Sequence, residues 1–179
     1  MEELLARQKT LMLSTLTSNH SPFISYAPYI MRGHDIYIYI SQTAEHYHNL
    51  VANPACAIMI IEDEHEAKNI FARQRVSFVA SATLVEEEEE VYEWFKEAHD
   101  HKMIERLRTM DFGFFKLTLK KGRLVKGFGQ AFDINYSNGI PSLSPVGGEG
   151  TAHQVHLQKL WVIRLFSIKK FLCKITVIS

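Results

Sequence analysis

The sequence predicts an α+β protein or a closed antiparallel β-barrel. About seven segments have the short apolar or alternating pattern of β-strands, and most are joined by turns too short for a parallel crossover. Two longer segments have helical periodicity, and they do not alternate with the strands. At 179 residues the chain is long enough for one domain with a substantial core.

The first part of the chain predicts a short helix and three strands, at residues 2–9, 10–17, 23–31 and 36–41. Pro28 interrupts the second strand, which suggests a sheet edge or a bulge. The third strand alternates Ile and Tyr with a period of two, so Ile lies on one face and Tyr on the other. A single small barrel covers only its inner face, so the other face needs a helix or a partner subunit.

The rest of the chain predicts a helix, two strands, a second helix and a hairpin, at residues 43–54, 55–62, 75–85, 86–110 and 112–134. Thr43 is a plausible N-cap of the first of these helices, and Pro54 ends it. We expect the hairpin to turn at Lys121 and Gly122. Residues 135–151 are rich in Gly, Ser, Pro and Asn, so we expect a flexible linker there.

The charge balance and the cysteine count narrow the class of protein. The 20 basic and 20 acidic residues cancel, so the bulk charge gives no reason to expect nucleic acid or an anionic membrane as a partner. No run approaches the ~18–20 uncharged residues that a membrane-spanning helix needs. Cys56 and Cys173 make no disulfide framework and fit a reducing compartment. We therefore expect a cytoplasmic protein with neither nucleic acid nor a membrane among its partners.

The nine histidines show no zinc-site spacing. His46 and His48 are two residues apart on the predicted helix 43–54, so they point to different faces, either toward a ligand at the helix edge or toward solvent. The stretch "GFGQAF" (127–132) lacks the third glycine of a dinucleotide fingerprint and opens no helix. Its glycines indicate a bulge or a close backbone approach instead.

Two arginines are better candidates for ligand binding. Arg73 and Arg75 alternate into the start of the strand 75–85 and would project to the same side. Arginine forks suit carboxylates and phosphates, so a ligand with propionates or a phosphate would find donors here. The alternative is an exposed pair that bridges to the acid-rich segment 62–66.

The chain resembles the HugZ/HutZ-type heme-utilisation proteins in three stretches, "SYAPY" (25–29), "TAEHYHNLVANPACAIMIIEDEHEAKNIFARQRVSF" (43–78) and "VKGFGQAF" (125–132). These proteins are relatives of the pyridoxamine 5′-phosphate oxidase and FMN-binding split-barrel superfamily, and the resemblance runs from about Gln8 to about Leu157. It implies an α+β fold with an antiparallel split β-barrel and flanking helices, and a homodimer with heme at the subunit interface. Heme is then degraded to a biliverdin-type product in the presence of oxygen and an electron donor of unknown identity, with release of iron.

The resemblance also implies roles for single residues. Asp111 matches the acidic partner of the axial histidine, and Thr10 lies near the same hydrogen-bonded site. Arg75 matches an arginine near the heme, with Arg73 beside it as a second candidate for binding. A carboxylate in such a place fixes the tautomer of the imidazole that holds the iron and raises its basicity.

The axial histidine itself is missing from its expected place. In the family it belongs to a Gly-His that follows a Val-His-Leu, and this chain has "VHL" at 155–157 but no Gly-His. His156 and His153 are the remaining candidates for the iron ligand. From Val155 to Ser179 the chain holds five Lys or Arg residues and no Asp or Glu.

The predicted organisation has three parts: a split-barrel domain at residues 1–134, a flexible linker with the C-terminal heme-site segment at 135–158, and an atypical basic and hydrophobic tail at 159–179. We hypothesise that the tail results from a reading-frame change near the end of the gene, which would also explain the missing Gly-His. The alternative is a genuine extension that packs as an extra strand or helix.

Two other functions remain open at this point. A flavin-dependent oxidoreductase of the same barrel fold would clasp the phosphate of FMN with Arg73, Arg75 and the pair Ser41–Gln42. A non-catalytic heme carrier or storage protein would bind heme and leave the ring intact.

Overall fold

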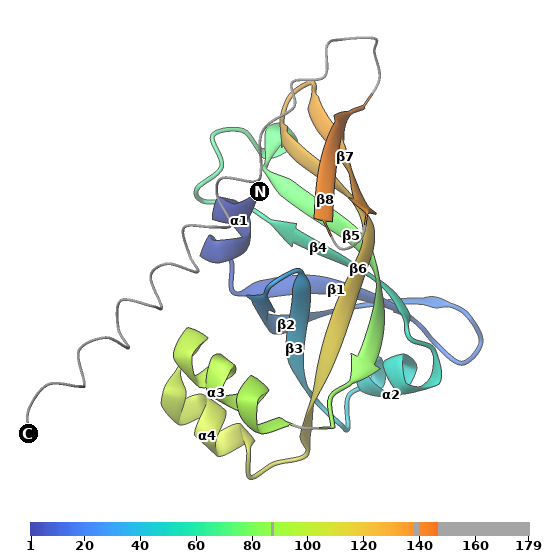
Figure 1. The fold of residues 1–179 in the computed structure, drawn as a ribbon, viewed down its shortest axis with the longest axis vertical. Coiled ribbons are helices and arrows are strands. Elements are labelled where there is room, and N and C mark those ends of the chain that lie inside the picture. The colour runs from blue at the N-terminus through green and yellow to red at the C-terminus, as the bar shows by residue number, and fades with distance from the viewer. Residues whose placement is uncertain (87, 138–139, 147–179) are drawn as a thin grey trace, which may run out of the picture. The chain divides into compact units, whose positions relative to one another are not determined.

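The structure, a computed structural model, describes residues 1–86, 88–137 and 140–146 (Figure 1). Its strands are β1 (Thr10–Leu16), β2 (Pro22–Arg32), β3 (Asp35–Ser41), β4 (Ala55–Ile61), β5 (Arg75–Leu84), β6 (Phe112–Gly127), β7 (Gln130–Ser137) and β8 (Ile140–Pro145). Its helices are α1 (Glu2–Arg7), α2 (Glu45–Ala52), α3 (Glu88–Ala98), α4 (His101–Leu107) and the 3₁₀ turn η1 (Ile70–Ala72). Strands β3-β2-β1-β4-β5-β6 pair in that order, and β3 also pairs with β6, which closes a six-stranded antiparallel barrel. The expected α+β fold with an antiparallel barrel and flanking helices is confirmed.

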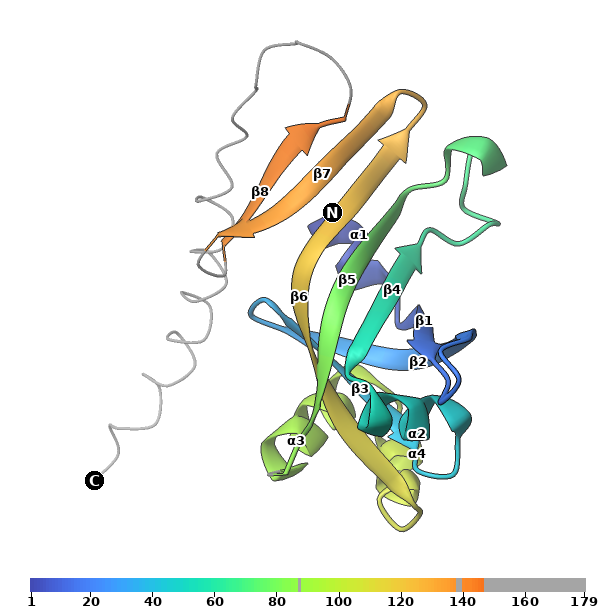
Figure 2. The same cartoon turned by 90° about the vertical axis from the view of Figure 1, so that its right-hand side faces the viewer.

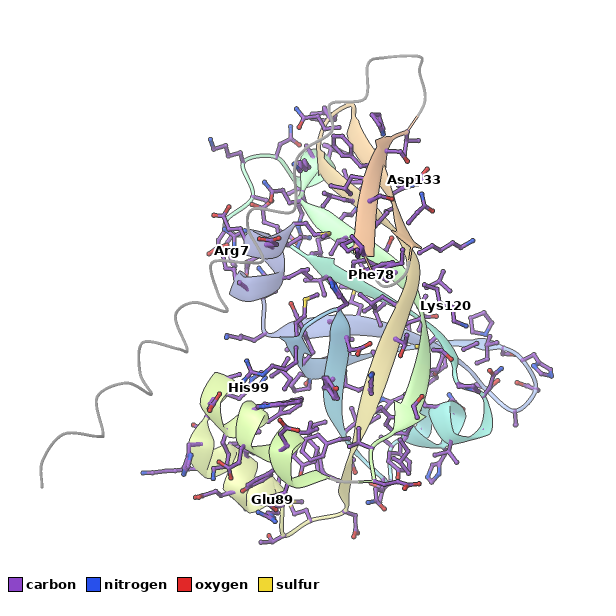
Figure 3. The ribbon with its side chains drawn as sticks, in the orientation of Figure 1. Arg7, Phe78, Glu89, His99, Lys120 and Asp133 are labelled. Carbon is purple, nitrogen blue, oxygen red and sulfur yellow. The ribbon has the colours of Figure 1, made fainter. Side chains whose placement is uncertain are left out.

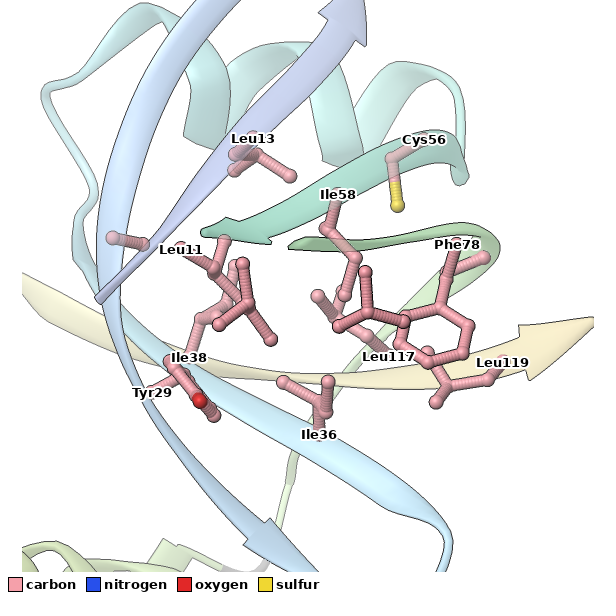
Figure 4. Close-up of a cluster of buried hydrophobic side chains, with 14 of the residues drawn as sticks. Leu11, Leu13, Tyr29, Ile36, Ile38, Cys56, Ile58, Phe78, Leu117 and Leu119 are labelled. Carbon is pink, nitrogen blue, oxygen red and sulfur yellow. The ribbon is translucent and has the colours of Figure 1, made fainter. Parts of the chain in front are cut away.

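Inward-pointing side chains of the six strands fill the barrel (Figure 4). Leu11, Leu13, Ile36, Ile38 and Leu117 are each at most 2% exposed. Burying such a side chain contributes about 1.5–3 kcal/mol. Because successive side chains of a strand point to opposite faces, this apolar interior also fixes which residues face outward, where a ligand can reach them.

The helices α3 and α4 cover the Tyr face of β3, and Figure 1 shows them beside β3 and the start of β6. Tyr39 is 5% exposed, and its ring stacks on that of Phe114 with 4.0 Å between the centroids. Phe95 of α3 is fully buried against the same cluster. The predicted separation of Ile and Tyr faces is confirmed, and a helix pair rather than a partner subunit covers the Tyr face.

The predicted helix 86–110 is two helices. The chain breaks at His99 and Asp100, and the Asp100 carboxylate accepts a hydrogen bond of 3.1 Å from the backbone N–H of Met103, which caps α4. An aspartate at this place competes for backbone donors and so starts a new helix within a segment whose periodicity looks continuous. Thr43 was wrong as the cap of α2: Ala44 holds that position, and the Thr43 hydroxyl bonds with that of Ser41 at 2.9 Å.

The predicted turn at Lys121 and Gly122 is also wrong. Strand β6 runs through both residues, and Figure 2 shows it as the longest strand, ending at its turn with β7. That turn lies at residues 128–129, where Gly129 has a φ of 66°, and the β6–β7 register shifts between Val125 and Gly127, so the expected bulge at the glycines of "GFGQAF" is confirmed and a turn follows it. At Gly122 the strands come close together, because a Cβ there would lie 2.5 Å from the carbonyl oxygen of Ser77.

The predicted linker 135–151 is wrong where the structure describes it. β7 continues to Ser137 and pairs with β8, which extends the sheet past the predicted domain end at 134. The tail 159–179 and the histidines His153 and His156 lie outside the described residues. In the part of the chain that is described, none of the helices has the length and hydrophobicity to cross a membrane.

Pro28 marks the point where β2 changes partner. Residues 22–28 of β2 pair with β1, and residues 29–32 pair with β3. The second edge of the 22–28 stretch therefore lacks a strand partner among the described pairings, which confirms the expected sheet edge.

Candidate functional site

The outward surface of β2, β1, β4 and β5 is mostly apolar. We call it the outer sheet face, and its central side chains come from two adjacent cross-strand rows that hold two serines, Ser14 and Ser77, and six apolar residues: Met12, Ile24, Tyr26, Ala57, Met59 and Val79. Ile24 is 72% exposed, Tyr26 69% and Met12 42%. A contiguous exposed apolar surface on a sheet is typical of a site for a ligand or a protein partner.

Thr10 and Arg75 lie together on the next row of the same face. Arg75 pairs with Ile61, and the β1–β4 register, which pairs Met12 with Met59, brings Thr10 opposite Ile61 when it is extended by two residues. Two strand spacings, about 10 Å between Cα atoms, thus separate Thr10 from Arg75. Both side chains point outward, because their neighbours in sequence point into the barrel.

Arg73 has a different task from Arg75. It precedes β5, and its guanidinium donates to the carbonyl oxygen of Glu62 at 3.1 Å and pairs with the Glu64 carboxylate at 3.4 Å. The alternative of a bridge to the segment 62–66 is therefore correct for Arg73. Arg75 donates one bond of 3.1 Å to the Arg73 carbonyl and forms no ion pair with any carboxylate among the described residues, so most of its donors are free for a ligand.

Asp111 lies at the other end of the barrel from Arg75. It immediately precedes β6, its backbone carbonyl accepts a hydrogen bond of 2.8 Å from the Gln42 N–H, and its side chain is exposed. Arg75 pairs with Val125 near the far end of β6. A strand rises about 3.3 Å per residue, so about 45 Å of curved strand separates Asp111 from that row. One chain does not bring Asp111 and Arg75 together.

A cavity of about 320 Å³ lies between the barrel and the α3–α4 pair. Most of its lining side chains are aromatic or aliphatic and come from six elements, among them Tyr26, Pro28, Tyr39, Phe95 and Phe112. His46 of α2 supplies an imidazole, and its Nε2 atom is buried with no hydrogen-bond partner among the described residues. Burial lowers the pKa of His46, so this imidazole is neutral at pH 7.

This cavity adjoins two of the predicted site residues. Thr10 pairs with Pro28, which lines it, and Asp111 precedes Phe112, which also lines it. His48 is exposed, so the prediction that His46 and His48 face different directions is confirmed. The sequence pattern did not reveal the cavity, because its walls come from segments that are far apart along the chain.

The residues predicted to hold an FMN phosphate are not brought together. Ser41 pairs with Phe112 at the start of β6, whereas Arg75 pairs with Val125 near its end. Arg73 is already bound to Glu62 and Glu64. Within the described ranges, no three His, Cys, Asp or Glu side chains gather into a metal-ligand cluster.

The sequence also matches a known protein family and a characterised relative. Residues 1–126 match the pyridoxamine 5′-phosphate oxidase family. The heme oxygenase HutZ of Vibrio cholerae serotype O1 is 38% identical over 142 residues, which are 75% of this chain and 78% of that protein.

Two solved structures share the fold at similar identity. The crystal structure of Campylobacter jejuni ChuZ is 36% identical with a TM-score of 0.73, over 86% of this chain and 63% of that one, so the chain spans less than two thirds of the length of ChuZ. The structure of HutZ from Vibrio cholerae, described as a heme storage protein, is 36% identical with a TM-score of 0.62, over 66% of this chain and 87% of that one.

Proposed function

The chain belongs to the pyridoxamine 5′-phosphate oxidase family, as a HutZ-type heme-utilisation protein, and on that premise we propose that two copies of it bind heme between them and degrade it. The reaction is oxygen-dependent, takes electrons from a donor of unknown identity, and yields a biliverdin-type product and iron. Two relatives are named for heme: the heme oxygenase HutZ and a heme-binding protein of Mycobacterium smegmatis, which is 25% identical with a TM-score of 0.61.

One observation carries the proposal: a largely apolar sheet face ends in an arginine that has no acidic partner among the described side chains. A porphyrin needs apolar cover on its faces and cations for its two carboxylates. The outer sheet face offers the first through exposed side chains such as Tyr26 and Met12, and Arg75 offers the second. The described residues therefore fit heme.

The positions of Asp111 and Arg75 support a homodimer. They lie at opposite ends of β6, so heme that contacts both must lie between two chains, with Asp111 from one copy and Arg75 from the other. The outer sheet face is self-complementary in character, apolar and uncharged at its centre, as the isologous interface of a twofold dimer requires.

The proposed roles follow from the chemistry of each side chain. Bound heme supplies the iron at which oxygen reacts. The Asp111 carboxylate accepts a hydrogen bond from the imidazole that holds the iron and keeps it in the right tautomer. Thr10 would support the same hydrogen-bonded site, and Arg75 would donate to a carboxylate of heme. His156, or else His153, is the proposed ligand.

A heme titration followed by reduction tests the proposal. We expect purified protein to develop a Soret band with heme, and then to lose it with formation of a bilin when ascorbate and oxygen are added. Asp111→Asn should shift the Soret band and slow ring opening at least tenfold, because the amide cannot hold the imidazolate-like charge. His156→Ala should change the spectrum if His156 is the ligand. Absence of any Soret band in the wild type would refute the proposal.

Heme storage is a second candidate, because the solved HutZ structure is described as that of a heme storage protein. A storage protein would give the same Soret band, but the band would survive ascorbate and oxygen and no bilin would form. FMN has less support, because Arg73 is engaged and no Lys or Arg is among the residues that line the cavity beside Ser41. A cytoplasmic location remains part of the proposal, and the free buried thiol of Cys56 agrees with it.

A further inference from the structure

A second cavity, of about 470 Å³, opens on the outward side of β5, β6 and β7. It begins where the outer sheet face ends, because Ala57 and Val79 belong to both. The register of β5 and β6 shifts between Val79 and Ala80, so Lys120 is an extra residue in β6. A bulge of this kind re-aims side chains, and here both Lys120 and Lys121 are exposed beside the cavity.

Two cations line this cavity, Lys121 and Arg123, and the exposed Lys120 precedes them in β6; we call the three residues the basic rim. Arg123 donates to a single oxygen of Asp133, with its Nε at 3.0 Å and an Nη at 2.9 Å. Lys121 has no ion pair among the described residues, and neither has Lys120. Figure 3 labels Lys120 beside β6, Phe78 on β5 and Asp133 on β7.

The charges of the basic rim do not cancel. Lys121 and Arg123 face the one carboxylate of Asp133, which leaves one positive charge at the mouth of a cavity whose lining includes apolar side chains such as Val79. Arg75 lies on the same outward face as Arg123: it pairs with Val125, two residues along β6, so the two arginines are diagonal neighbours. The positive charge is thus continuous from Arg75 to Lys121.

We propose that this cavity, together with the adjacent Arg75, binds the two carboxylates of the tetrapyrrole, with Lys121 and Arg123 as the anchors that the cavity itself provides. The inference rests on the proposed function and names the part of the molecule that recognises the ligand. Two propionates carry two negative charges, which match the two cations that have no acidic partner here among the described residues, Lys121 and the neighbouring Arg75. The apolar ring then lies against the outer sheet face, which continues from the same cavity.

Metal-free protoporphyrin IX and its dimethyl ester test this inference without iron or turnover. We expect the wild type to bind the diacid about tenfold more tightly than the ester, because the ester carries no charge for the exposed cations of the rim to pair with. Lys121→Ala and Arg123→Gln should each weaken the diacid several-fold and leave the ester unchanged. Lys102→Ala, on an exposed lysine of α4, removes the same charge elsewhere and should change neither.

Asp133→Asn is expected to raise the affinity for the diacid, a result that a poorly folded variant would not give. The amide removes the one carboxylate that competes for Arg123, so the diacid should bind more tightly than to the wild type, with no change for the ester. If the wild type, Lys121→Ala, Arg123→Gln and Asp133→Asn all bind diacid and ester alike, these anchors are wrong although porphyrin binding stands. If the wild type binds neither porphyrin, the anchors also fail, and the heme titration then decides the proposed function separately.

Discussion

Arg73 and Arg75 are two residues apart in the sequence but have different roles: the first stabilises the fold and the second is available to a ligand. The Arg73 side chain is 20% exposed and holds the loop between β4 and β5 through Glu62 and Glu64, whereas Arg75 keeps its donors for a ligand. We predict that Arg73→Ala lowers the free energy of unfolding by about 1–3 kcal/mol, because it leaves a partly buried carbonyl oxygen unpaired. Arg75→Ala should lower it by less than about 0.5 kcal/mol and weaken heme binding instead.

Urea denaturation and heme titration of the two variants check this pair of predictions. Arg106→Ala serves as a control for loss of an exposed arginine, since Arg106 lies on α4 and forms no ion pair among the described residues. Equal loss of stability in Arg73→Ala and Arg75→Ala would contradict the prediction that Arg73 stabilises the fold and Arg75 does not.

His99 makes stability depend on pH. Its Nε2–H donates to the carbonyl oxygen of Tyr29 at 3.0 Å, and its ring stacks on Phe95 (Figure 3). Burial lowers the pKa of His99 below its ordinary value of 6.5. Between the lowered pKa and 6.5 the unfolded chain binds more protons than the folded one, so the free energy of unfolding must fall as the pH falls through this window.

We therefore predict that the urea midpoint drops from pH 7.5 to pH 5.5, and that His99→Gln drops less over the same interval. His46, whose pKa is also lowered by burial, contributes with the same sign, so His99→Gln removes only part of the effect. His65→Gln, on an exposed loop, should keep the wild-type slope. A His99→Gln slope equal to that of the wild type would show that this histidine does not contribute.

At the level of single residues, the sequence predicted which side chains can bind a ligand better than it predicted where those side chains lie in the fold. It indicated that Arg73 and Arg75 were donors and that His46 and His48 faced apart, because strand and helix periods carry that information. It did not reveal that Asp111 and Arg75 lie at opposite ends of β6, because distance along a curved sheet depends on pairings between remote segments. The basic rim was also missed, since Lys121 was assigned to a turn.

At the level of elements, two glycines of the β6–β7 region are needed for different reasons. A Cβ at Gly122 would lie 2.5 Å from both the Ser77 carbonyl oxygen and the Phe78 ring. Gly129 has open space around it but a φ of 66°. We predict that Gly122→Ala and Gly129→Ala each cost about 1–3 kcal/mol in the free energy of unfolding.

Asparagine distinguishes the two causes. It tolerates positive φ, so Gly129→Asn should cost less than Gly129→Ala, whereas Gly122→Asn should cost more than Gly122→Ala because it is larger. Thermal unfolding of the four variants measures this. If Asn cost less than Ala at both positions, backbone strain would act at both. If Asn cost more than Ala at both, a close contact would act at both.

The elements that the sequence predicted correctly are those with a clean period. β3 alternates Ile and Tyr, so its inward face follows from the sequence; β4 is a continuous apolar run, which predicts a strand but not which of its residues face the barrel interior. β8 reads "IPSLSP", in which prolines and serines hide a strand that a sheet edge tolerates. The break between α3 and α4 depends on one Asp cap inside a continuous helical pattern.

The whole molecule is predicted to be a homodimer through its outer sheet face. Ile24 and Tyr26 are 72% and 69% exposed, so a charge there costs the single chain little. In a twofold dimer each substitution enters the interface twice, and like charges then face each other. We predict that Ile24→Glu and Tyr26→Glu sediment near the chain mass of 20.6 kDa, and the wild type near twice that mass.

Met103→Glu is the matched control, because Met103 is an exposed apolar residue, 52% exposed, on α4 and away from this face. It should remain dimeric in sedimentation velocity. Dimers of unchanged stability in Ile24→Glu and Tyr26→Glu would contradict this interface, while the barrel itself would stand.

If each heme site is shared between two chains, two different inactive variants can restore activity when they form a mixed dimer. If each heme site takes Asp111 from one copy and Arg75 from the other, a mixed dimer of Asp111→Ala and Arg75→Ala chains contains one site with both substitutions and one with neither. Random reassortment makes half of the dimers mixed, so about a quarter of the wild-type sites should return.

We predict that unfolding and refolding the two inactive variants together restores bilin formation to about that level, while each variant refolded alone stays inactive. No recovery, with mixed dimers verified by mass, would mean that both residues serve the same chain, and the separation of Asp111 and Arg75 along β6 would then leave at most one of them at the heme.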